Sequence, residues 1–166
     1  MIVSHPEVYR KVNQEIDDVF GDSNRLTTSE DLKKLDYLEM ALKEAMRIHP
    51  AVPVIGRTTT EDIEIDDYKI PAKHWVNLFI GALHRDPQYF PDPLFYNPDR
   101  FLPENIKERH PYAFIPFSAG RRNCIGQKFA MTEEKTLLSW IFRKFQVETT
   151  QSETDIHPEM GLVLRP

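Results

Sequence analysis

Proline is the residue that most limits the folds open to this chain. The 166 residues include 13 prolines, most of them between Pro50 and Pro116. Proline fixes φ and lacks a backbone N–H, so it ends helices and is excluded from central strands. The segments 84–105 and 110–117 therefore cannot form long regular elements. They nevertheless carry aromatic residues that we expect to pack inward, namely Tyr89, Phe90, Phe95, Tyr96 and Phe101.

Outside this segment the sequence predicts helices. Over residues 4–21, Ser4 and Glu7 fit a capping box and Gly21 suits a helix end. The apolar residues between them recur at helical spacing, at Val8, Val12, Ile16, Val19 and Phe20. We predict a helix that begins at Ser4 and ends at Gly21.

Two further helices follow a polar loop. Thr28 or Ser29 is a candidate cap for a short helix over residues 30–35. The next helix ends at Pro50. Its apolar stripe consists of Leu35, Leu38, Leu42, Ala45 and Ile48.

A last helix is predicted from Cys124 to Phe145. The residues expected on its broad apolar face are Ala130, Leu137, Leu138, Ile141, Phe142 and Phe145.

Alternating apolar and polar residues predict strands in the middle of the chain. Residues 63–65 and 68–70 flank a turn candidate at Asp66 and Asp67. Residues 75–80 are expected to add a further strand, and residues 160–166 a final one. Helices combined with small sheets predict a mainly α fold of the α+β class, and we find no linker that divides residues 1–166.

Composition excludes several classes of protein. The net charge is −5 and there is no dense basic run, which argues against nucleic acid as a partner. One cysteine excludes an intrachain disulfide. No segment approaches the roughly 20 apolar residues of a transmembrane helix. The N-terminus also lacks the apolar core of a signal peptide.

The single cysteine, Cys124, lies directly before the predicted C-terminal helix. The N–H groups of Ile125, Gly126 and Gln127 are expected to lack helical acceptors there. Such donors and the positive helix end stabilise a thiolate, the form that binds metal ions. A lone cysteine is more often only a small buried apolar side chain, so its neighbours must decide between the two interpretations.

The neighbours of Cys124 are compatible with more than one chemistry. A zinc site is a poor fit, because no second cysteine or histidine lies at ligand spacing. Nucleophilic catalysis stays open, although the sequence identifies no base. A haem needs one protein sulfur, an apolar bed and cations for its propionates. Arg122 offers such a cation, Phe117 offers shielding of the sulfur, and Gly120 and Gly126 allow a close backbone approach.

The segment "FSAGRRNCIG" resembles the haem-binding signature of the cytochromes P-450, the haem-thiolate monooxygenases. Other landmarks occur in that family's order: "EAMR" at 44–47, "PVIGR" at 53–57, "HRDP" at 84–87 and "NPDRF" at 97–101. The wording is closest to the eukaryotic microsomal branch that includes fatty-acid ω-hydroxylases. Two positions depart from that branch: Arg121 stands where proline is common, and Lys73 where glycine is common.

The resemblance implies a cofactor, haem b, with Cys124 as its axial iron ligand. Phe117, Gly120 and Gly126 match the signature, and Arg122 and Arg57 match its two propionate-binding arginines. From spacing alone, Glu44 and Arg47 would be an exposed ion pair. The resemblance instead implies a buried structural network of Glu44, Arg47 and Arg100. It also suggests a partner-docking face that includes Arg121, Lys128 and Lys135, although each of them taken singly fits a solvated basic rim better.

The activity implied is insertion of one oxygen atom from O2 into a small lipophilic substrate such as a fatty acid. Electrons would come from NADPH through a flavoprotein reductase, at the endoplasmic reticulum membrane. The chain resembles the C-terminal third of one such domain, without the acid–threonine helix that handles oxygen. We therefore expect an incomplete piece that is inactive in isolation. A non-catalytic haem-binding remnant or interaction protein is the alternative.

Overall fold

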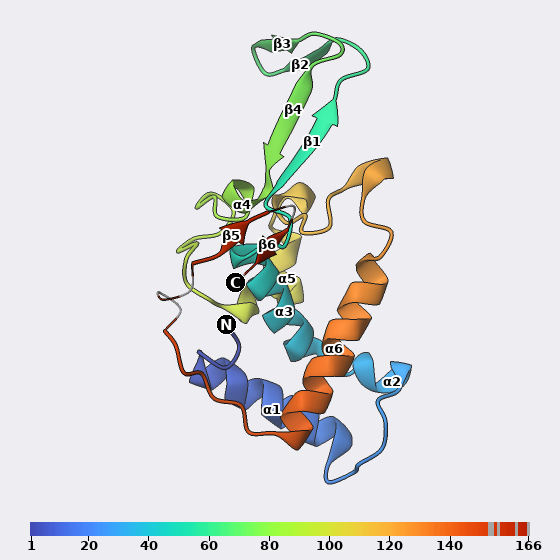
Figure 1. Ribbon diagram of the computed structural model, residues 1–166, viewed down its shortest axis with the longest axis vertical. Coiled ribbons are helices and arrows are strands. Elements are labelled where there is room, and N and C mark those ends of the chain that lie inside the picture. Colours follow the sequence, from blue (N-terminus) through green and yellow to red (C-terminus); the bar gives the residue numbers. More distant parts are fainter. Residues whose placement is uncertain (153–154, 156, 162, 166) are drawn as a thin grey trace.

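The computed structural model describes residues 1–152, 155, 157–161 and 163–165 (Figure 1). Short 3₁₀ turns at Pro98–Phe101, Pro111–Ala113 and Gly120–Arg122 accompany the main elements. In chain order the helices and strands are α1 (Pro6–Phe20), α2 (Ser29–Leu32), α3 (Asp36–Ile48), β1 (Val54–Thr58), β2 (Ile63–Ile65), β3 (Tyr68–Ile70), β4 (Trp75–Phe79), α4 (Ile80–Leu83), α5 (Pro103–Lys107), α6 (Gln127–Lys144), β5 (Glu159–Met160) and β6 (Leu164–Arg165).

The main core lies where α1, α3 and α6 meet (Figure 1). The stripe predicted for α3 is confirmed, since Leu35 and Leu38 are fully buried. The α1 face agrees as well, with Val12 and Ile16 almost without exposed surface. Complete burial of side chains of this size contributes about 1.5–3 kcal/mol each. This helical core is the foundation on which the irregular segments are held.

The start of the first helix differs from expectation. The capping box predicted at Ser4 is wrong, because α1 begins at Pro6 and its N-cap is His5, without a side-chain cap. Proline is favoured in the first helical turn, where its missing N–H costs nothing. The predicted end is confirmed: Gly21 has φ of 51° and its N–H bonds to the carbonyl of Asp17.

Two caps connect the helices to their surroundings. Thr28 caps α2 as expected, exchanging hydrogen bonds with Asp31 in a capping box. Sequence analysis did not identify the cap of α3, which comes from another helix. The carboxylate of Glu15 on α1 accepts the N–H groups of Tyr37 at 2.6 Å and Leu38 at 2.9 Å. This contact ties the first turn of α3 to α1.

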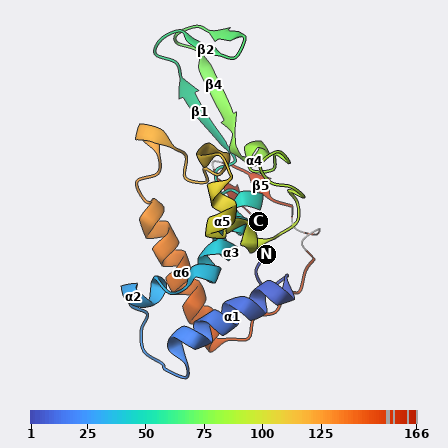
Figure 2. The same ribbon diagram turned by 180° about the vertical axis from the view of Figure 1, so that it is seen from behind.

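A two-stranded ribbon projects from the helical part, as Figure 1 and the reverse view in Figure 2 both show. The predicted hairpin of β2 and β3 is confirmed and forms its tip, with Asp66 in the turn at φ of 50°. The strand predicted at 75–80 also exists, but it pairs with β1 rather than with the hairpin. The antiparallel pairing places Arg57 opposite Val76.

Two positions in the ribbon depend on their backbone. Gly56 lies under the indole of Trp75, and a Cβ at this position would meet the ring at 2.0 Å. The Trp75 Nε1–H also donates to Asn77 Oδ1 at 2.7 Å. Lys73, at the position where glycine is common, has φ of 64°, and its N–H bonds to the Thr59 carbonyl at 2.8 Å. The turn is thus kept by a lysine in a left-handed conformation, which costs about 1–2 kcal/mol.

The proline-rich segment is irregular but packed, as predicted. Phe90, Tyr96 and Phe101 are buried, and the Tyr96 hydroxyl donates to the Ala41 carbonyl at 2.7 Å. Phe95 is the exception, because 63% of its surface is exposed. Its backbone carbonyl, rather than its ring, faces the core, where it accepts a hydrogen bond from Arg47.

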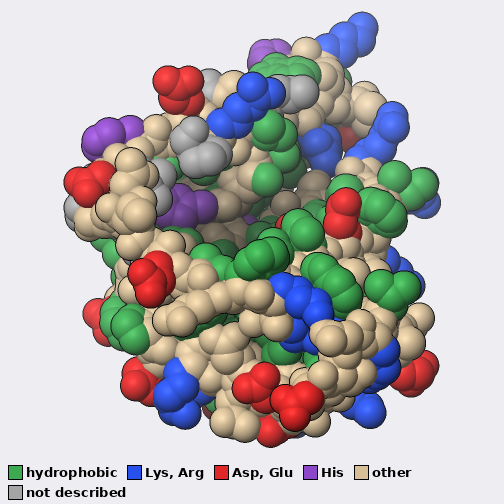
Figure 3. All heavy atoms as spheres, turned by 60° about the horizontal axis from the view of Figure 1, so that its bottom comes forward, with side chains coloured by type: hydrophobic (Ala, Val, Ile, Leu, Met, Phe, Trp, Pro, Cys, Tyr) green, Lys and Arg blue, Asp and Glu red, His purple; other side chains and the backbone are tan. Residues whose placement is uncertain are grey.

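The last helix is shorter than predicted and only partly covered. α6 begins at Gln127 instead of Cys124, and its N-cap is Gly126. Of its expected apolar face, Leu137 and Phe145 remain 56% and 65% exposed. Figure 3 likewise shows hydrophobic side chains at the surface among charged ones, around a hollow. Strands β5 and β6 cover part of the predicted final strand, while Leu162 and Pro166 lie outside the described residues.

Candidate functional site

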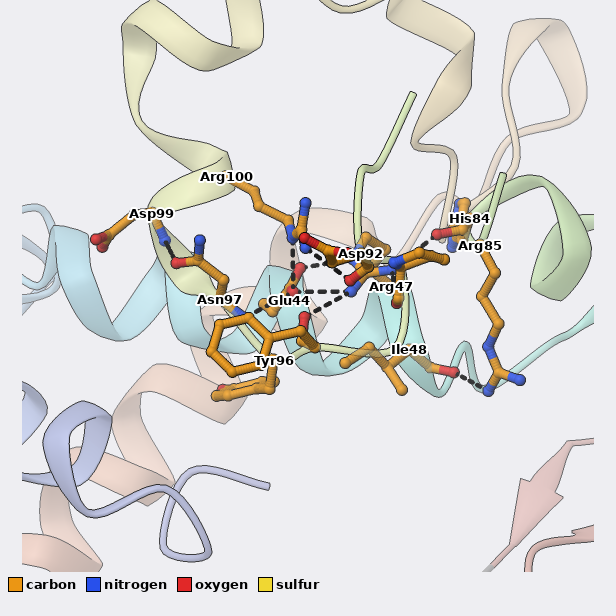
Figure 4. A network of polar contacts seen from close by, with 12 residues as sticks. Glu44, Arg47, Ile48, His84, Arg85, Asp92, Tyr96, Asn97, Asp99 and Arg100 are labelled. Atoms are coloured by element: carbon orange, nitrogen blue, oxygen red, sulfur yellow. Dashed lines mark hydrogen bonds and ion pairs between the residues drawn. The ribbon is translucent and has the colours of Figure 1, made fainter. Parts of the chain in front are cut away.

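A buried ion pair on α3 organises the centre of the molecule (Figure 4). Arg47 donates to the Glu44 carboxylate through Nε at 2.7 Å and Nη2 at 2.8 Å. Both side chains are completely buried. The helical spacing predicted the contact, but a simple exposed pair is excluded.

Arg47 also holds the proline-rich segment. Its Nη1 donates to the carbonyls of His84 at 2.9 Å and Pro93 at 2.6 Å. The N–H of Asn97 returns a hydrogen bond of 2.9 Å to Glu44 Oε1. Backbone groups that no sheet could pair are satisfied in this way, which is what an irregular buried segment requires.

Arg100 joins this network, as the family resemblance implied. Its Nε lies 3.3 Å from Glu44 Oε1, an ion-pair distance, although the N–H is not aligned for a hydrogen bond. Its Nη2 donates to the carbonyl of Asp92 at 2.9 Å. Burial lowers the pKa of Arg100 from its ordinary value, while the Glu44 charge opposes that shift.

His84, at the start of the "HRDP" segment, is a second buried polar group in the same region. Its Nε2 accepts the N–H of Ile115 at 2.9 Å, so the neutral ring carries its proton on Nδ1. Burial lowers the pKa of His84 to about 4, against the opposing effect of the Met46 carbonyl. His84 therefore links α4 to the segment that leads into the cysteine loop.

The cysteine loop runs from Phe117 to Gly126. The Cys124 N–H bonds back to the Phe117 carbonyl at 2.9 Å, which closes the loop. Positive φ values at Ser118 (62°) and Gly120 (75°) make the reversal. Phe117 is half-buried at the base of the loop, and the Cys124 thiol is free and exposed.

The N–H donors expected beside Cys124 are present in part. The N–H of Gln127 bonds to the Cys124 carbonyl at 3.4 Å, so it is not free as predicted. Those of Ile125 and Gly126 have no backbone acceptor among the described residues. A Cβ at Gly126 would lie 3.8 Å from the Cys124 sulfur, an ordinary contact. Two apolar residues close to Cys124 in sequence, Ile125 and Phe129, are also exposed, the first fully and the second to 71%.

The two arginines that match the family's propionate-binding positions belong to this loop or contact it. The Arg57 guanidinium donates to the Ser118 hydroxyl at 2.9 Å and to the Gly56 carbonyl at 2.8 Å. This contact joins strand β1 to the cysteine loop, and no sequence pattern identified it. Arg122 is exposed, and its side chain has no hydrogen-bond or ion-pair partner within the described part of the chain.

One of the three residues suggested for a docking face does not belong there. Lys135 is buried and its ammonium lies 2.9 Å from Glu39 on α3. It is a core-facing contact between α6 and α3, because the helix turns that side chain inward. Arg121 and Lys128 are exposed.

The donor set around Cys124 limits what the loop can bind. Within residues 1–152, 155, 157–161 and 163–165, no three His, Cys, Asp or Glu side chains form a metal-binding group. One exposed sulfur, exposed apolar side chains and two guanidiniums fit a flat prosthetic group that brings its own metal and its own carboxylates. Helices crossing a membrane are likewise not found in this part of the chain.

Comparison with known proteins gives consistent matches. The family model described as Cytochrome P450 matches residues 1–166. The chain is 52% identical over 166 residues to "Cytochrome P450 4V2" of Homo sapiens, covering 100% of this chain and 32% of that protein. It is 44% identical over 163 residues to "Cytochrome P450 4c3" of Drosophila melanogaster, covering 98% of this chain and 30% of that protein.

Solved structures agree. A crystal structure of a cytochrome P450 (CYP102L1) superposes with a TM-score of 0.91 at 27% identity, covering 99% of this chain and 38% of that chain. The haem domain of cytochrome P450DA gives 0.90 at 32% identity, covering 98% and 35%. The chain thus spans about a third of the length of the curated relatives it matches.

Proposed function

The chain belongs to the cytochrome P450 family, and from that premise we propose that it supplies the thiolate side of a haem monooxygenase. The family resemblance and the α+β fold class expected from sequence are both confirmed by these matches. The observation that carries the proposal is the exposed Cys124 thiol on a loop that a hydrogen bond to Phe117 closes.

Each residue has a role in this proposal. Cys124 ligates the iron of haem b, and Arg57 and Arg122 bind its propionates through forked N–H donors. Gly120 and Gly126 have no Cβ, so the haem can approach the loop backbone closely. Phe117 shields the sulfur. Bound haem would supply the iron centre at which oxygen is activated.

The network of Glu44, Arg47 and Arg100 has a structural role in this proposal. It lies beneath the loop-bearing segment and holds carbonyls of the proline-rich chain at 2.6 to 2.9 Å. The hydrogen bond from the Ile115 N–H to His84 connects this network to the segment just before the cysteine loop. This network would hold the Cys124 sulfur in place, as a residue that ligates a metal requires.

The whole reaction proposed is insertion of one oxygen atom from O2 into a small lipophilic substrate, such as a fatty acid. Electrons come from NADPH through a flavoprotein reductase, at the endoplasmic reticulum membrane. The similarity to proteins named Cytochrome P450 4V2 and 4c3 supports this class. A purified sample of the 166 residues with a reductase is expected to show no turnover, because the sequence contains no acid–threonine pair of the Ala-Gly-x-Asp/Glu-Thr form.

The missing acid–threonine pair also favours a second candidate function. The chain would then bind haem, or a protein, without catalysis. Turnover of any substrate by the purified chain with NADPH and reductase would exclude this alternative and contradict the expected inactivity.

The test of haem ligation is spectroscopic. The haem-reconstituted chain, reduced and exposed to carbon monoxide, is expected to show the red-shifted Soret band of thiolate ligation. Cys124→Ser should abolish that band. Asn123→Ser, which introduces serine at the preceding residue, should retain it. An unchanged band in Cys124→Ser would mean that another residue is the ligand. Arg57→Gln and Arg122→Gln should each weaken haem retention relative to Arg121→Gln.

A further inference from the structure

A polar hollow of about 400 Å³ lies beside the Glu44 network, on the side of the proline-rich segment. Its wall includes Gln88, Asn97, Arg100, Asn105, Glu108 and Arg109. Neither Cys124 nor any other residue of the cysteine loop contributes to it. The hollow is therefore separate from the proposed haem site, and its chemistry requires its own account.

Among the charged residues that line this hollow, the guanidiniums of Arg100 and Arg109 stand against one carboxylate, that of Glu108. Glu44 is the one carboxylate buried in the network, and Arg47 already forms two hydrogen bonds to it. The Glu44 charge also acts on Arg100, at an ion-pair distance of 3.3 Å, and on Arg109. The other nearby acids, Asp92 and Glu108, are exposed to solvent. The two partly buried guanidiniums of Arg100 and Arg109 thus lie near one buried carboxylate, Glu44, which Arg47 already engages.

Arg109 is held rigidly with most of its donors free. Its guanidinium lies over the ring of Phe90 at 4.4 Å and over that of Phe101 at 5.4 Å. One N–H, from Nη2, donates to the Arg100 carbonyl at 2.7 Å. No other hydrogen bond of this guanidinium is found in the described part of the chain. Stacking between aromatic rings fixes the fork without using its N–H groups.

Electrostatics agree with this geometry. Burial lowers the pKa of Arg109, the charges of Arg100 and Arg47 lower it further, and the Glu44 charge opposes the shift. Burial likewise lowers the pKa of Arg100. A negative ligand in the hollow would remove part of this repulsion. It would also receive charge-assisted hydrogen bonds, the strongest class available to an arginine.

We propose that this hollow binds a small oxyanion of the phosphate class, held by Arg109 and Arg100 with amide donors from its wall. The site accepts inorganic phosphate or the phosphate group of a small monoester. Because it borders Arg100, its ligand contacts the network that supports the cysteine loop. Occupancy therefore stabilises the fold without taking part in the oxidation chemistry.

The experiment is titration of the full chain by calorimetry and NMR. Sodium phosphate is compared with sodium chloride at equal ionic strength, and glycerol 2-phosphate is the second arm. Saturable binding of phosphate beyond chloride is expected, and the tighter of the two phosphates identifies the source. Arg109→Gln should weaken binding about tenfold or more, since a charge-assisted bond contributes about 1.5–3 kcal/mol. Arg121→Gln, which removes an exposed arginine elsewhere, should leave the affinity unchanged.

A second variant guards against misfolding of Arg109→Gln. Glu108 is exposed, so Glu108→Gln is expected to fold normally. It removes the acid at the wall of the hollow and should tighten phosphate binding about two- to fivefold. Phosphate that binds no better than chloride would overturn the proposal. An unchanged affinity in Glu108→Gln would overturn it as well, because the bound anion would then lie elsewhere.

Discussion

The guanidinium of Arg57 donates a 2.9 Å hydrogen bond to the hydroxyl of Ser118, a residue 61 positions further along the chain. The contact is the link between the projecting ribbon and the cysteine loop. Arg57 is thus oriented by the loop whose cofactor it is proposed to bind, so a change at Ser118 acts on both.

Ser118 allows the contributions of this hydrogen bond and of the loop backbone to be separated. Ser118→Ala removes the acceptor, which should cost about 0.5–1.5 kcal/mol of unfolding free energy. Ser118→Gly removes the same acceptor, but glycine accepts the positive φ of 62° without strain. We therefore expect Ser118→Gly to be the more stable of the two variants in urea denaturation. Equal stabilities would contradict the importance of the left-handed backbone.

The buried ion pair predicts a large loss at Glu44. Glu44→Gln leaves the Arg47 charge buried without a carboxylate, at a cost of about 3–5 kcal/mol. Glu30 and Lys33 form a matched control, because they have the same spacing with side chains 76% and 69% exposed. Glu30→Gln should give no measurable change. Both values come from urea denaturation followed by circular dichroism, and similar losses at the two sites would contradict the buried geometry.

His84 predicts how stability depends on pH. Its pKa in the folded chain is lowered to about 4 from the ordinary 6.5, so the unfolded chain binds this proton more readily. The contribution of the neutral His84 ring to the unfolding free energy is fully present above pH 6.5 and is lost as pH falls toward 4. It amounts to about 3 kcal/mol over that window.

His84→Gln is the matched variant for this measurement. Glutamine keeps an acceptor for the N–H of Ile115 but does not titrate. Unfolding free energies measured from pH 7 to 4 should therefore fall less steeply in the variant than in the parent chain. Parallel curves would mean that His84 does not control this dependence.

Lys73 predicts a stabilising substitution. Its φ of 64° is strained for a lysine, and glycine adopts such a conformation freely. After the entropy cost of glycine in the unfolded chain, Lys73→Gly should raise the unfolding free energy by about 0.5–1 kcal/mol. Lys73→Ala keeps the strain and should be close to neutral. A loss of stability in Lys73→Gly would show that the lysine side chain matters more than its backbone.

Sequence patterns predicted the regular core well because local spacing dictates it. The stripe along α3 and the hairpin at Asp66 follow from helical and strand periodicity alone. The cap at Ser4 failed because a proline two residues later moved the helix start. The pairing of β4 with β1 was missed because no strand was predicted over residues 54–58, where the prolines at 50 and 53 hide the pattern.

The site was harder to predict, since its contacts are distant in sequence. Arg47 is satisfied by carbonyls of His84 and Pro93, which lie 37 and 46 residues away. Nothing near Lys135 indicated that it would pair with Glu39, 96 residues before it. Glu15 caps α3 from another helix, and periodicity carries no signal for such a contact. The family resemblance placed Arg100 in the network, where spacing alone would not have done so.

The indole of Trp75, resting on the bare backbone of Gly56, has an evolutionary consequence. Any side chain at position 56 must push the ring outward and break its bond to Asn77. The two positions are therefore expected to vary together, because a lineage that replaces the glycine must also move or replace the tryptophan. Arg57 is the next residue in β1, so a change at this pair also acts on a residue that is proposed to bind the cofactor.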